Sequence, residues 1–376
     1  MPKVLFIRSN PVNPDSRVEK EVNSLIQSGY EVDVLGWDRE ANYALREEKL
    51  VLTAGSARCF RVGIKAAYGS GIRNIRNLLS FQNEIHRFLK IRRTEYDIVH
   101  ACDFDTAFAA FVSVNHKRTK LVYDIFDYYV ESMRIPQALK PIIVSLDRYV
   151  MNNADAVIIC TEQRKEQIGN VTPNKLIVIH NSPPQYNSED VGASTRSIMK
   201  IAYFGILPAE GRMIRELLDI VSQNPKYELH IGGFGGIDEE VKRAAEKYKN
   251  IVFYGRTPYS DVLKIESECD VLTALYDPSI PNHFYAAPNK FYEALMLGKP
   301  VIMAKNTGMS YIIEEYGIGC RIDYSYEGLK IGLATLWENR TQWSGLSRVM
   351  KQIYTEHYSW GQMEKRLLKL YQELLE

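Results

Sequence analysis

Short apolar runs alternate with stretches of helical period along the whole chain, and this alternation constrains the fold more than any other feature. The runs are continuous and often β-branched, as is typical of strands buried on both faces of a parallel sheet. Predicted strands span 3–8, 31–35, 97–100, 121–124, 156–160 and 176–180, then 201–204, 228–232, 251–254, 271–274, 300–303 and 319–322. Repeated βα units of this kind predict an α/β protein with doubly wound sheets.

One polar segment, 183–196, interrupts the alternation. It contains Pro, Ser and Gly without an apolar period, which predicts a linker. The chain of 376 residues would then hold an N-terminal domain at 1–182, a C-terminal domain at 197–354 and a final amphipathic helix within 355–376. Two Rossmann-like domains would bind ligands at the carboxyl ends of their strands, in a cleft between the domains.

Composition and charge exclude several classes of protein. Lys plus Arg is 47 and Asp plus Glu is 46, so the net charge of +1 gives no global reason to expect nucleic acid as a partner. The five cysteines include no C-x-x-C pair, which argues against a disulfide framework or structural zinc and favours a cytoplasmic location. No apolar stretch approaches the ~20 residues of a spanning helix.

The stretch 282–302, N-H-F-Y-A-A-P-N-K-F-Y-E-A-L-M-L-G-K-P-V-I, carries the most information. Pro288 predicts a helix start and Gly298 a helix end, directly before the strand at 300–303. The helix start would present N–H groups to phosphate or sugar hydroxyls. Lys290 and Glu293 share one helix face, which suits a cation for phosphate and a carboxylate for a ribose diol. From spacing alone, an ordinary surface Lys–Glu pair is the alternative.

The segment P-N-K-F-Y-E-A-L-M-L-G-K-P-V-I closely resembles the donor-site signature of glycosyltransferase family 4, retaining enzymes of the GT-B fold. Further stretches resemble the family in the same order, at 17–19, 29–32, 96–101, 153–158, 178–181, 202–205 and 358–360. The resemblance implies two Rossmann-like domains whose parallel sheets face a central cleft. It also implies that the last helix packs back on the N-terminal domain.

For the C-terminal domain, the resemblance implies a nucleotide-sugar site. Glu293 would bind the ribose, while Lys290 and Arg212 would grip the diphosphate. The family's second glutamate, eight residues before Glu293, is replaced by Tyr285, so sugar specificity cannot be transferred. The implied donor-binding residues are Gly205, Arg212, Tyr285, Ala287, Pro288, Asn289, Lys290 and Glu293.

The implied catalytic residues are Asp127, Arg212 and Lys290. Asp127 keeps an acidic position of the family, but Phe126 stands where many relatives have histidine. A retaining transfer needs no side-chain base, because a leaving phosphate oxygen can take the acceptor proton. The protein then aligns both substrates and stabilises charge on the diphosphate. We expect neither metal nor another cofactor, because the two cations replace a metal.

The first domain would bind a glycan or polyprenyl-linked acceptor. Asp103 and Asp105 follow a strand end, and Arg17 begins the first helix, so all three are candidates; a surface role is the alternative for Arg17. Asp103-Phe104-Asp105 also matches a D-x-D metal motif, but three residues are too weak a pattern to predict metal. Residues 72–93 form a basic amphipathic pattern, which is typical of a domain helix with a solvated basic face. The alternative is peripheral contact with the inner face of the cell membrane, because such a helix can rest on anionic lipid.

The preferred function is sugar transfer in surface polysaccharide or glycoconjugate synthesis. Two other classes stay open. Tyr285 and Phe126 motivate a catalytically silent GT-B protein that binds nucleotide sugar or glycan. A Rossmann oxidoreductase would need a complete glycine fingerprint, but Asp238 stands at the third glycine of the 232–236 loop.

Overall fold

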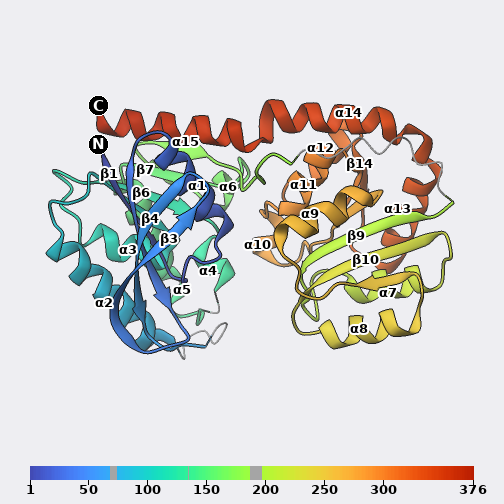
Figure 1. The fold of residues 1–376 in the computed structure, drawn as a ribbon, viewed down its shortest axis with the longest axis horizontal. Helices are drawn as coiled ribbons and strands as arrows, with labels where there is room; N and C mark the ends of the chain where they lie inside the picture. The colour runs from blue at the N-terminus through green and yellow to red at the C-terminus, as the bar shows by residue number, and fades with distance from the viewer. Residues whose placement is uncertain (68–73, 134, 187–196) are drawn as a thin grey trace. The chain divides into compact units, whose positions relative to one another are not determined.

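The computed structural model describes residues 1–67, 74–133, 135–186 and 197–376. The chain forms two compact units (Figure 1): Met1–His180 with Met363–Glu376, and Asn181–Gln362. Each unit is built on one sheet whose strands are mainly parallel, which confirms the predicted fold class. Most of the predicted linker, 187–196, lies outside the described residues.

The first unit contains an eight-stranded sheet in the order β3-β4-β2-β1-β5-β6-β7-β8. Every neighbouring pair is parallel except β3–β4, which is antiparallel. The strands are β1 Lys3–Arg8, β2 Glu31–Asp38, β3 Tyr43–Leu52, β4 Gly55–Gly63, β5 Ile98–Cys102, β6 Lys120–Ile125, β7 Ala156–Ile159 and β8 Leu176–Val178.

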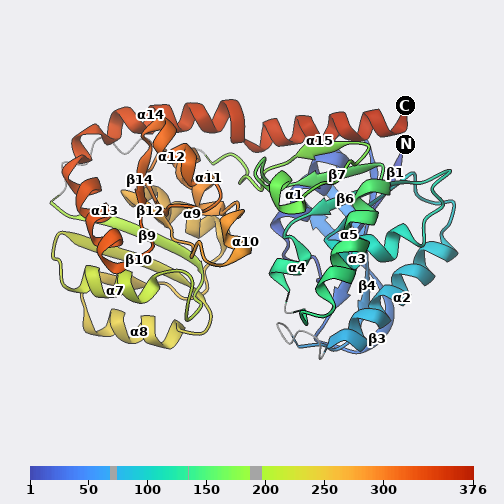
Figure 2. The same ribbon diagram turned by 180° about the vertical axis from the view of Figure 1, so that it is seen from behind.

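The helices of this unit cover both faces of the sheet. They are α1 Ser16–Gln27, α2 Ile75–Ile91, α3 Phe104–Phe111, α4 Tyr129–Ser132, α5 Lys140–Asn153, α6 Arg164–Ile168 and α15 Trp360–Leu375. In Figure 2, α3 lies between α2 and α5, and it contacts both. The core beneath them is formed by apolar side chains of the central strands and of α2, α3 and α5. The predicted basic helix at 72–93 corresponds to α2, and 72–73 lie outside the described residues.

One edge strand of this sheet, β3, is antiparallel and was not predicted from the sequence. The strand β3 (Y-A-L-R-E-E-K-L-V-L) is largely exposed and carries charges, so it lacks the continuous apolar run of a buried strand. It pairs only with β4, through the short turn between Leu52 and Gly55. Charged side chains on such an edge also discourage pairing with another chain.

The second unit contains a six-stranded sheet in the order β11-β10-β9-β12-β13-β14, and every neighbouring pair is parallel. Its strands are β9 Met199–Ile206, β10 Tyr227–Phe234, β11 Ile251–Phe253, β12 Val271–Ala274, β13 Val301–Ala304 and β14 Gly319–Ile322. Its helical elements are α7 Ile214–Ser222, α8 Asp238–Lys247, α9 Tyr259–Glu268, α10 Pro281–Phe284, α11 Asn289–Leu297, α12 Ser310–Tyr316, α13 Tyr326–Glu338, the 3-10 turn η2 Arg340–Gln342, α14 Trp343–Ile353 and the π-helical turn η3 Tyr354–Tyr358.

Helix α11 forms as the sequence predicts. Pro288 is its N-cap, and Gly298 ends it in the left-handed conformation at φ 66°. All residues from Phe291 to Leu297 are buried, so the helix lies inside the second unit rather than on its surface. A helix held on all sides fixes the directions of the side chains in its first turn.

The terminal helix α15 belongs to the first unit from Met363 onward. Its buried residues Met363, Leu367, Leu370, Tyr371 and Leu374 recur at helical spacing. The His180 backbone N–H donates to the Met363 Sδ at 3.1 Å, which ties the helix to the end of the first unit's chain. Across the described ranges, no helix combines the length and apolarity needed to span a bilayer.

Candidate functional site

The donor residues predicted from the sequence gather at the C-terminal edge of the second sheet. Gly205 lies near the end of β9, and Arg212 lies in the loop that leads to α7. Lys290 and Glu293 lie on α11, between β12 and β13. Ligands of open α/β sheets bind at this edge, outside the carboxyl ends of the strands.

The Lys290 ammonium rests on the backbone of Gly205. Gly205 has φ 150°, and a Cβ added there would lie 2.8 Å from Nζ, so glycine is what allows the approach. The Nζ also lies 5.1 Å from the ring centroid of Tyr203. Burial lowers the pKa of Lys290, but Tyr276, Tyr203 and nearby carboxylates raise this pKa by more, so the ammonium stays charged.

The Arg212 guanidinium stacks on an aromatic ring beside Lys290. Its Cζ lies 3.5 Å from the ring centroid of Tyr276, and its Nη1 donates to the Gly211 carbonyl at 2.9 Å. Burial raises the pKa of Tyr203, while the charges of Lys290 and Arg212 both oppose that rise. Two cations therefore converge around the same tyrosines, an arrangement that suits an anion.

Glu293 lies behind the cations and is almost fully buried. It is 4% exposed, and one carboxylate oxygen accepts from the Tyr259 hydroxyl at 2.9 Å. Glu266 of α9 is buried nearby; its Oε2 has no hydrogen-bond partner among the described residues. Burial and the charge of Glu293 raise the pKa of Glu266 well above its ordinary value, against the effect of Lys290. The burial of Glu266 and its closeness to Glu293 therefore favour the neutral form of Glu266.

Residues 285–289 surround the start of α11. Tyr285 ends α10, and its ring contacts that of Phe284 at 4.9 Å between centroids. Ala287 packs against the core beneath the helix. The Asn289 Oδ1 accepts from the Asn181 amide at 3.0 Å, next to the N-cap Pro288. The predicted sugar-lining residues are thus adjacent to Lys290.

Three polar side chains of this edge escaped the sequence analysis: Tyr259, Glu266 and His283. None belongs to the P-N-K-F-Y-E signature, and only His283 lies within the stretch singled out at 282–302. Because Tyr259 and Glu266 come from α9, they reach Glu293 only through the packing of α9 on α11. Of these three residues, only His283 could have been suspected from the sequence, because it is polar and close to the signature.

In the first unit, Asp103 occupies a strained position between β5 and α3. It is the N-cap of α3 with φ 67° and ψ 161°, a conformation that non-glycine residues rarely adopt. Its Oδ1 accepts from the backbone N–H groups of Phe126 at 2.9 Å and Asp127 at 3.3 Å, and Arg8 forms an ion pair with it. Burial raises the pKa of Asp103 to about 6, against the effect of Arg8.

Asp127 faces solvent beside this strained residue. Its side chain is 55% exposed, and its Oδ1 accepts from the Arg164 Nη2 at 3.1 Å. Phe126 replaces the family's histidine, and its ring lies 4.1 Å from the Arg8 Cζ and 4.7 Å from the Arg17 Cζ. The structure therefore brings Asp103 and Asp127 together, and an aromatic ring separates two arginines.

Arg17 and Asp105 lie inside the first unit. Arg17 is 3% exposed and Asp105 is 4% exposed. The Arg17 Nη2 donates to both carboxylate oxygens of Asp124 at 2.8 and 3.0 Å, and its Nη1 donates to the Ile179 carbonyl at 3.0 Å. The N–H groups of Arg17 therefore donate to groups of the protein. A residue that binds the acceptor would need N–H groups that are available to the ligand.

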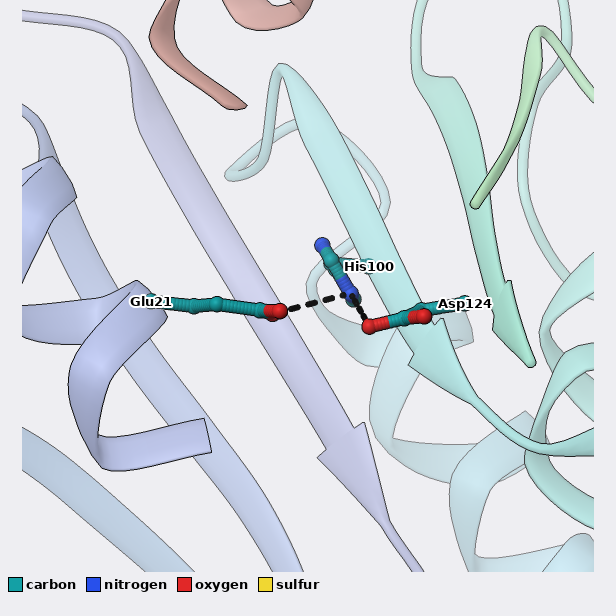
Figure 3. Close-up of side chains that lie close together, drawn as sticks. All are labelled: Glu21, His100 and Asp124. Carbon is teal, nitrogen blue, oxygen red and sulfur yellow. Dashed lines mark ion pairs between the residues drawn. The ribbon is translucent and has the colours of Figure 1, made fainter. Parts of the chain in front are cut away.

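Behind Arg17, Figure 3 shows Glu21, His100 and Asp124 pointing toward one another from α1, β5 and β6. The His100 Nε2 lies 3.5 Å from a Glu21 oxygen and 3.4 Å from an Asp124 oxygen. In type and spacing the three could ligate a metal, and they are the one such group in the described part of the chain. However, Arg17 lies 3.3 Å from Glu21 and pairs with Asp124, so a cation would meet its positive charge.

These three residues instead link the sheet to the terminal helix. The Tyr371 hydroxyl of α15 lies 2.7 Å from the His100 Nδ1, and the Phe6 ring stacks on the imidazole at 4.2 Å. Burial lowers the pKa of His100, and burial raises the pKa of Glu21 well above its ordinary value. Both groups are therefore held neutral beside the Arg17–Asp124 pair, as suits a structural cluster.

Comparisons with known proteins identify the family of both units. Residues 14–182 match the family model of the glycosyl transferase 4-like domain, and residues 200–339 match that of the glycosyl transferases group 1. Together the two matches cover most of the chain, one in each unit. None of the curated proteins matches the sequence.

Solved structures show the same fold over the full chain. Sucrose-phosphate synthase from Thermosynechococcus elongatus has a TM-score of 0.73 at 14% identity, covering 100% of this chain and 99% of the other. HepE of Anabaena, solved with UDP-glucose, has a TM-score of 0.68 at 14% identity, covering 99% and 100%. A mutant of TarM from S. aureus, solved with fondaparinux, alpha-GlcNAc-glycerol and UDP, has a TM-score of 0.67 at 12% identity, covering 100% and 99%. By its two family domains and its GT-B fold, the chain belongs to the glycosyltransferases, with a glycosyl transferase 4-like domain followed by a group 1 domain.

Proposed function

We propose that the second unit binds a nucleoside-diphosphate sugar at the C-terminal edge of its sheet, and that the enzyme transfers the sugar to a hydroxyl of a glycan or lipid-linked acceptor. The observation that carries the proposal is the convergence of Lys290 and Arg212 around Tyr203 and Tyr276. Among the described residues, neither cation forms an ion pair with a carboxylate of the protein. Two positive charges at the ends of long side chains suit the two phosphates of a diphosphate.

Each side chain then has a defined task. Lys290 and Arg212 stabilise the negative charge that grows on the diphosphate as the bond to the sugar breaks. The Glu293 carboxylate, which Tyr259 holds through a hydrogen bond, accepts from the ribose hydroxyls. Residues 285–289 contact the sugar. A leaving phosphate oxygen takes the acceptor proton on the same face, so the anomeric configuration is retained.

On this proposal, catalysis needs no metal, because the two cations supply the charge. Asp127, which is half-exposed, contacts the acceptor from the first unit beside Asp103. Solved relatives support a nucleotide donor: HepE is described with UDP-glucose and TarM with UDP. UDP is therefore the first nucleotide to test.

The decisive experiment is a thermal-shift panel with UDP, GDP, ADP, dTDP, CMP and NAD, without added metal. Ligand at ~100 times its Kd should add roughly 2.7 kcal/mol of stability. We expect one nucleoside diphosphate to stabilise the protein, in EDTA as well, and Lys290→Ala to abolish the shift. Lys305→Ala is the matched control, because Lys305 pairs with Asp323 at the surface.

A flat response to every diphosphate would contradict the donor site, and a response to NAD alone would favour an oxidoreductase. Binding without transfer, measured as no release of nucleoside diphosphate with any acceptor, would favour the silent GT-B protein. The replacement of the family's glutamate by Tyr285 is the observation behind that second candidate.

We also propose that α2 contacts the anionic inner face of the cell membrane. In this proposal the enzyme acts in a pathway that builds surface polysaccharide or another glycoconjugate. Leu79 is 58% exposed and Ile91 is 70% exposed, while Arg76, Arg87 and Lys90 lie on the same helix. Apolar side chains beside basic ones favour anionic lipid. Sedimentation with phosphatidylglycerol vesicles, but not phosphatidylcholine vesicles, should require these three basic residues; equal sedimentation after their change to Gln would refute the contact.

A further inference from the structure

We infer that His283 is a positioning residue that holds Arg212 ready for the diphosphate, and that it does so only as a neutral imidazole. His283 lies on α10, and the proposed mechanism gives it no task. The inference rests on the proposed function, because Arg212 needs aiming only if a diphosphate binds beside it.

The contacts of the imidazole define its protonation. The Arg212 Nη1 lies 2.8 Å from the His283 Nε2 and 3.3 Å from Nδ1. A guanidinium can only donate, so the nearer ring nitrogen must offer a lone pair. The Nδ1 lies 3.1 Å from the Asp277 carbonyl oxygen, which can only accept, so Nδ1 carries the hydrogen. A single neutral tautomer satisfies both contacts, and an imidazolium, with two N–H groups, does not.

The same contacts leave one edge of the guanidinium open. Among the described residues, every hydrogen bond of Arg212 is made by Nη1, to His283 and to the Gly211 carbonyl. Nη2 and Nε remain for a ligand. Two parallel N–H groups on one edge of an arginine match the oxygens of a phosphate. His283 therefore holds Nη1 in place and leaves Nη2 and Nε directed at the anion.

His283 packs against Tyr276 and Gly211, so its position can be transmitted to Arg212. The Tyr276 ring meets the imidazole edge-on, with centroids 5.2 Å apart, and also lies under the Arg212 guanidinium at 3.5 Å. A Cβ added at Gly211 would come within 3.4 Å of the His283 Cε1, so the imidazole packs directly on this glycine. Tyr276, Arg212 and His283 thus form one packed group.

Among the described residues, the charged or titratable groups that face the imidazole include Arg212 from the loop after β9, and Tyr276 and Asp277 from the loop after β12. The Asp277 carboxylate already accepts from the Ser279 N–H at 2.9 Å and from its hydroxyl at 2.7 Å. Histidine changes charge between about pH 5 and 8. Protonation would place an N–H and a second positive charge against Arg212 and displace the guanidinium.

The test measures the Kd of the best-binding nucleoside diphosphate, UDP first, from about pH 5.5 to 8.5 in the full-length protein. His283→Gln keeps an oxygen that accepts from Arg212 and an N–H that donates to Asp277, but it never ionises. We expect the wild type to lose roughly tenfold in affinity against His283→Gln toward low pH, as for one lost hydrogen bond to a charged group. Titration of the nucleotide itself cancels in this ratio.

Two further variants separate positioning from charge. His283→Lys carries a permanent charge and no acceptor, so it should bind roughly tenfold more weakly than His283→Gln even at high pH. His116→Gln, in the first unit, should follow the wild type at every pH. In an Arg212→Gln background, His283→Lys should have no further effect, since residues that act as a unit are not additive.

The outcomes are distinguishable. Parallel pH profiles for the wild type and His283→Gln overturn the inference, and so does wild-type affinity in His283→Lys. If no nucleoside diphosphate binds to the wild type at any pH, the proposed function itself fails. If binding is present but indifferent to the side chain at 283, only the inference fails.

Discussion

The two units differ in the partners of their cationic side chains. In the second unit, Lys290 and Arg212 rest on tyrosine rings, and within the described ranges no carboxylate pairs with either. In the first unit, Arg17 is buried against Asp124 and Glu21, and Arg8 pairs with Asp15 and Asp103. A cation that lacks a carboxylate partner attracts an anionic ligand, whereas a paired buried cation has its partner already. This difference is the reason that we propose a ligand site in the second unit and a structural role for Arg17 in the first.

The first prediction breaks the buried pair, and it has the largest expected effect. Arg17→Met removes the guanidinium and leaves Asp124 charged, buried and without its cationic partner, which should cost about 3–5 kcal/mol of unfolding free energy. Denaturant unfolding of the full chain should show the loss as an earlier transition, with nucleotide affinity unchanged in the folded protein.

The control is the exposed pair of the second unit. Arg215 binds Glu240 through several hydrogen bonds, yet both side chains are more than a third exposed. Arg215→Met should therefore leave the free energy of unfolding almost unchanged, because solvent screens an exposed pair. Equal costs for the two arginines would remove the contrast between a structural and an exposed ion pair.

The second prediction concerns Asp103. Because burial raises the pKa of Asp103 from its ordinary value of 3.8 to about 6, the folded state holds this proton more tightly than the unfolded chain. The stabilisation is fully present below about pH 4 and is lost as the pH rises through about 6. Across this window, a two-unit difference corresponds to about 2–3 kcal/mol.

Asp103→Asn cannot titrate, so it should lose this dependence. The measurement is the unfolding free energy of both proteins between about pH 4 and 7. Relative to the wild type, the variant should become steadily more stable as the pH rises through this range. A constant difference at every pH would mean that Asp103 titrates normally and is not a strained, buried acid.

The third prediction separates the ribose from the phosphates. Glu293→Gln keeps the size of the side chain but removes its charge, so UDP affinity should fall roughly 10- to 100-fold, as for a lost charged hydrogen bond. Pyrophosphate affinity should stay unchanged, because it engages only Lys290 and Arg212. Calorimetry with both ligands decides this, with Glu314→Gln on the exposed surface of α12 as the control. Equal weakening of both ligands would place Glu293 at the phosphates.

The fourth prediction has the smallest effect. In Gly205→Ala, the new Cβ would meet the Lys290 Nζ at 2.8 Å, and φ 150° is unfavourable for alanine. The end of a lysine can move, so the protein should fold but bind nucleotide several-fold more weakly, about 1 kcal/mol.

Gly345→Ala is the matched control, because nothing lies within 4 Å of the added Cβ. That helical change should leave nucleotide affinity intact. If Gly205→Ala also binds nucleotide with wild-type affinity, nucleotide binding does not depend on the close approach of Lys290 to Gly205.

The strands show how much of the fold can be predicted from the sequence. Each predicted run contains or overlaps a strand of the structure, because buried parallel strands are continuous and apolar. β3 and β4 were missed: exposed charges along β3 hide a strand that exists only by pairing with its neighbour. Helix α11 was predicted because its Pro and Gly boundaries are local features.

For the candidate site, the sequence supplied the residues that lie close along the chain. Lys290, Glu293 and 285–289 follow from one signature, and Arg212 was matched by its place after Gly205. Tyr259, Glu266 and His283 were not assigned, because their contacts join α9, α10 and the loop after β9 across the fold. Nothing in the spacing of Tyr259 and Glu293 predicts that they share a hydrogen bond.

The sequence by itself determined the two α/β units, all of their strands except β3 and β4, and the position of the donor signature, because apolar period and helix boundaries are local properties. Only the tertiary structure decided which charges have partners. Arg17 and Arg212 are both arginines near a helix start, yet one is enclosed with Asp124 and the other stacks on Tyr276 with one edge open. The reason is that the free energy of a charge depends on its burial and its neighbours, which residues distant in sequence supply.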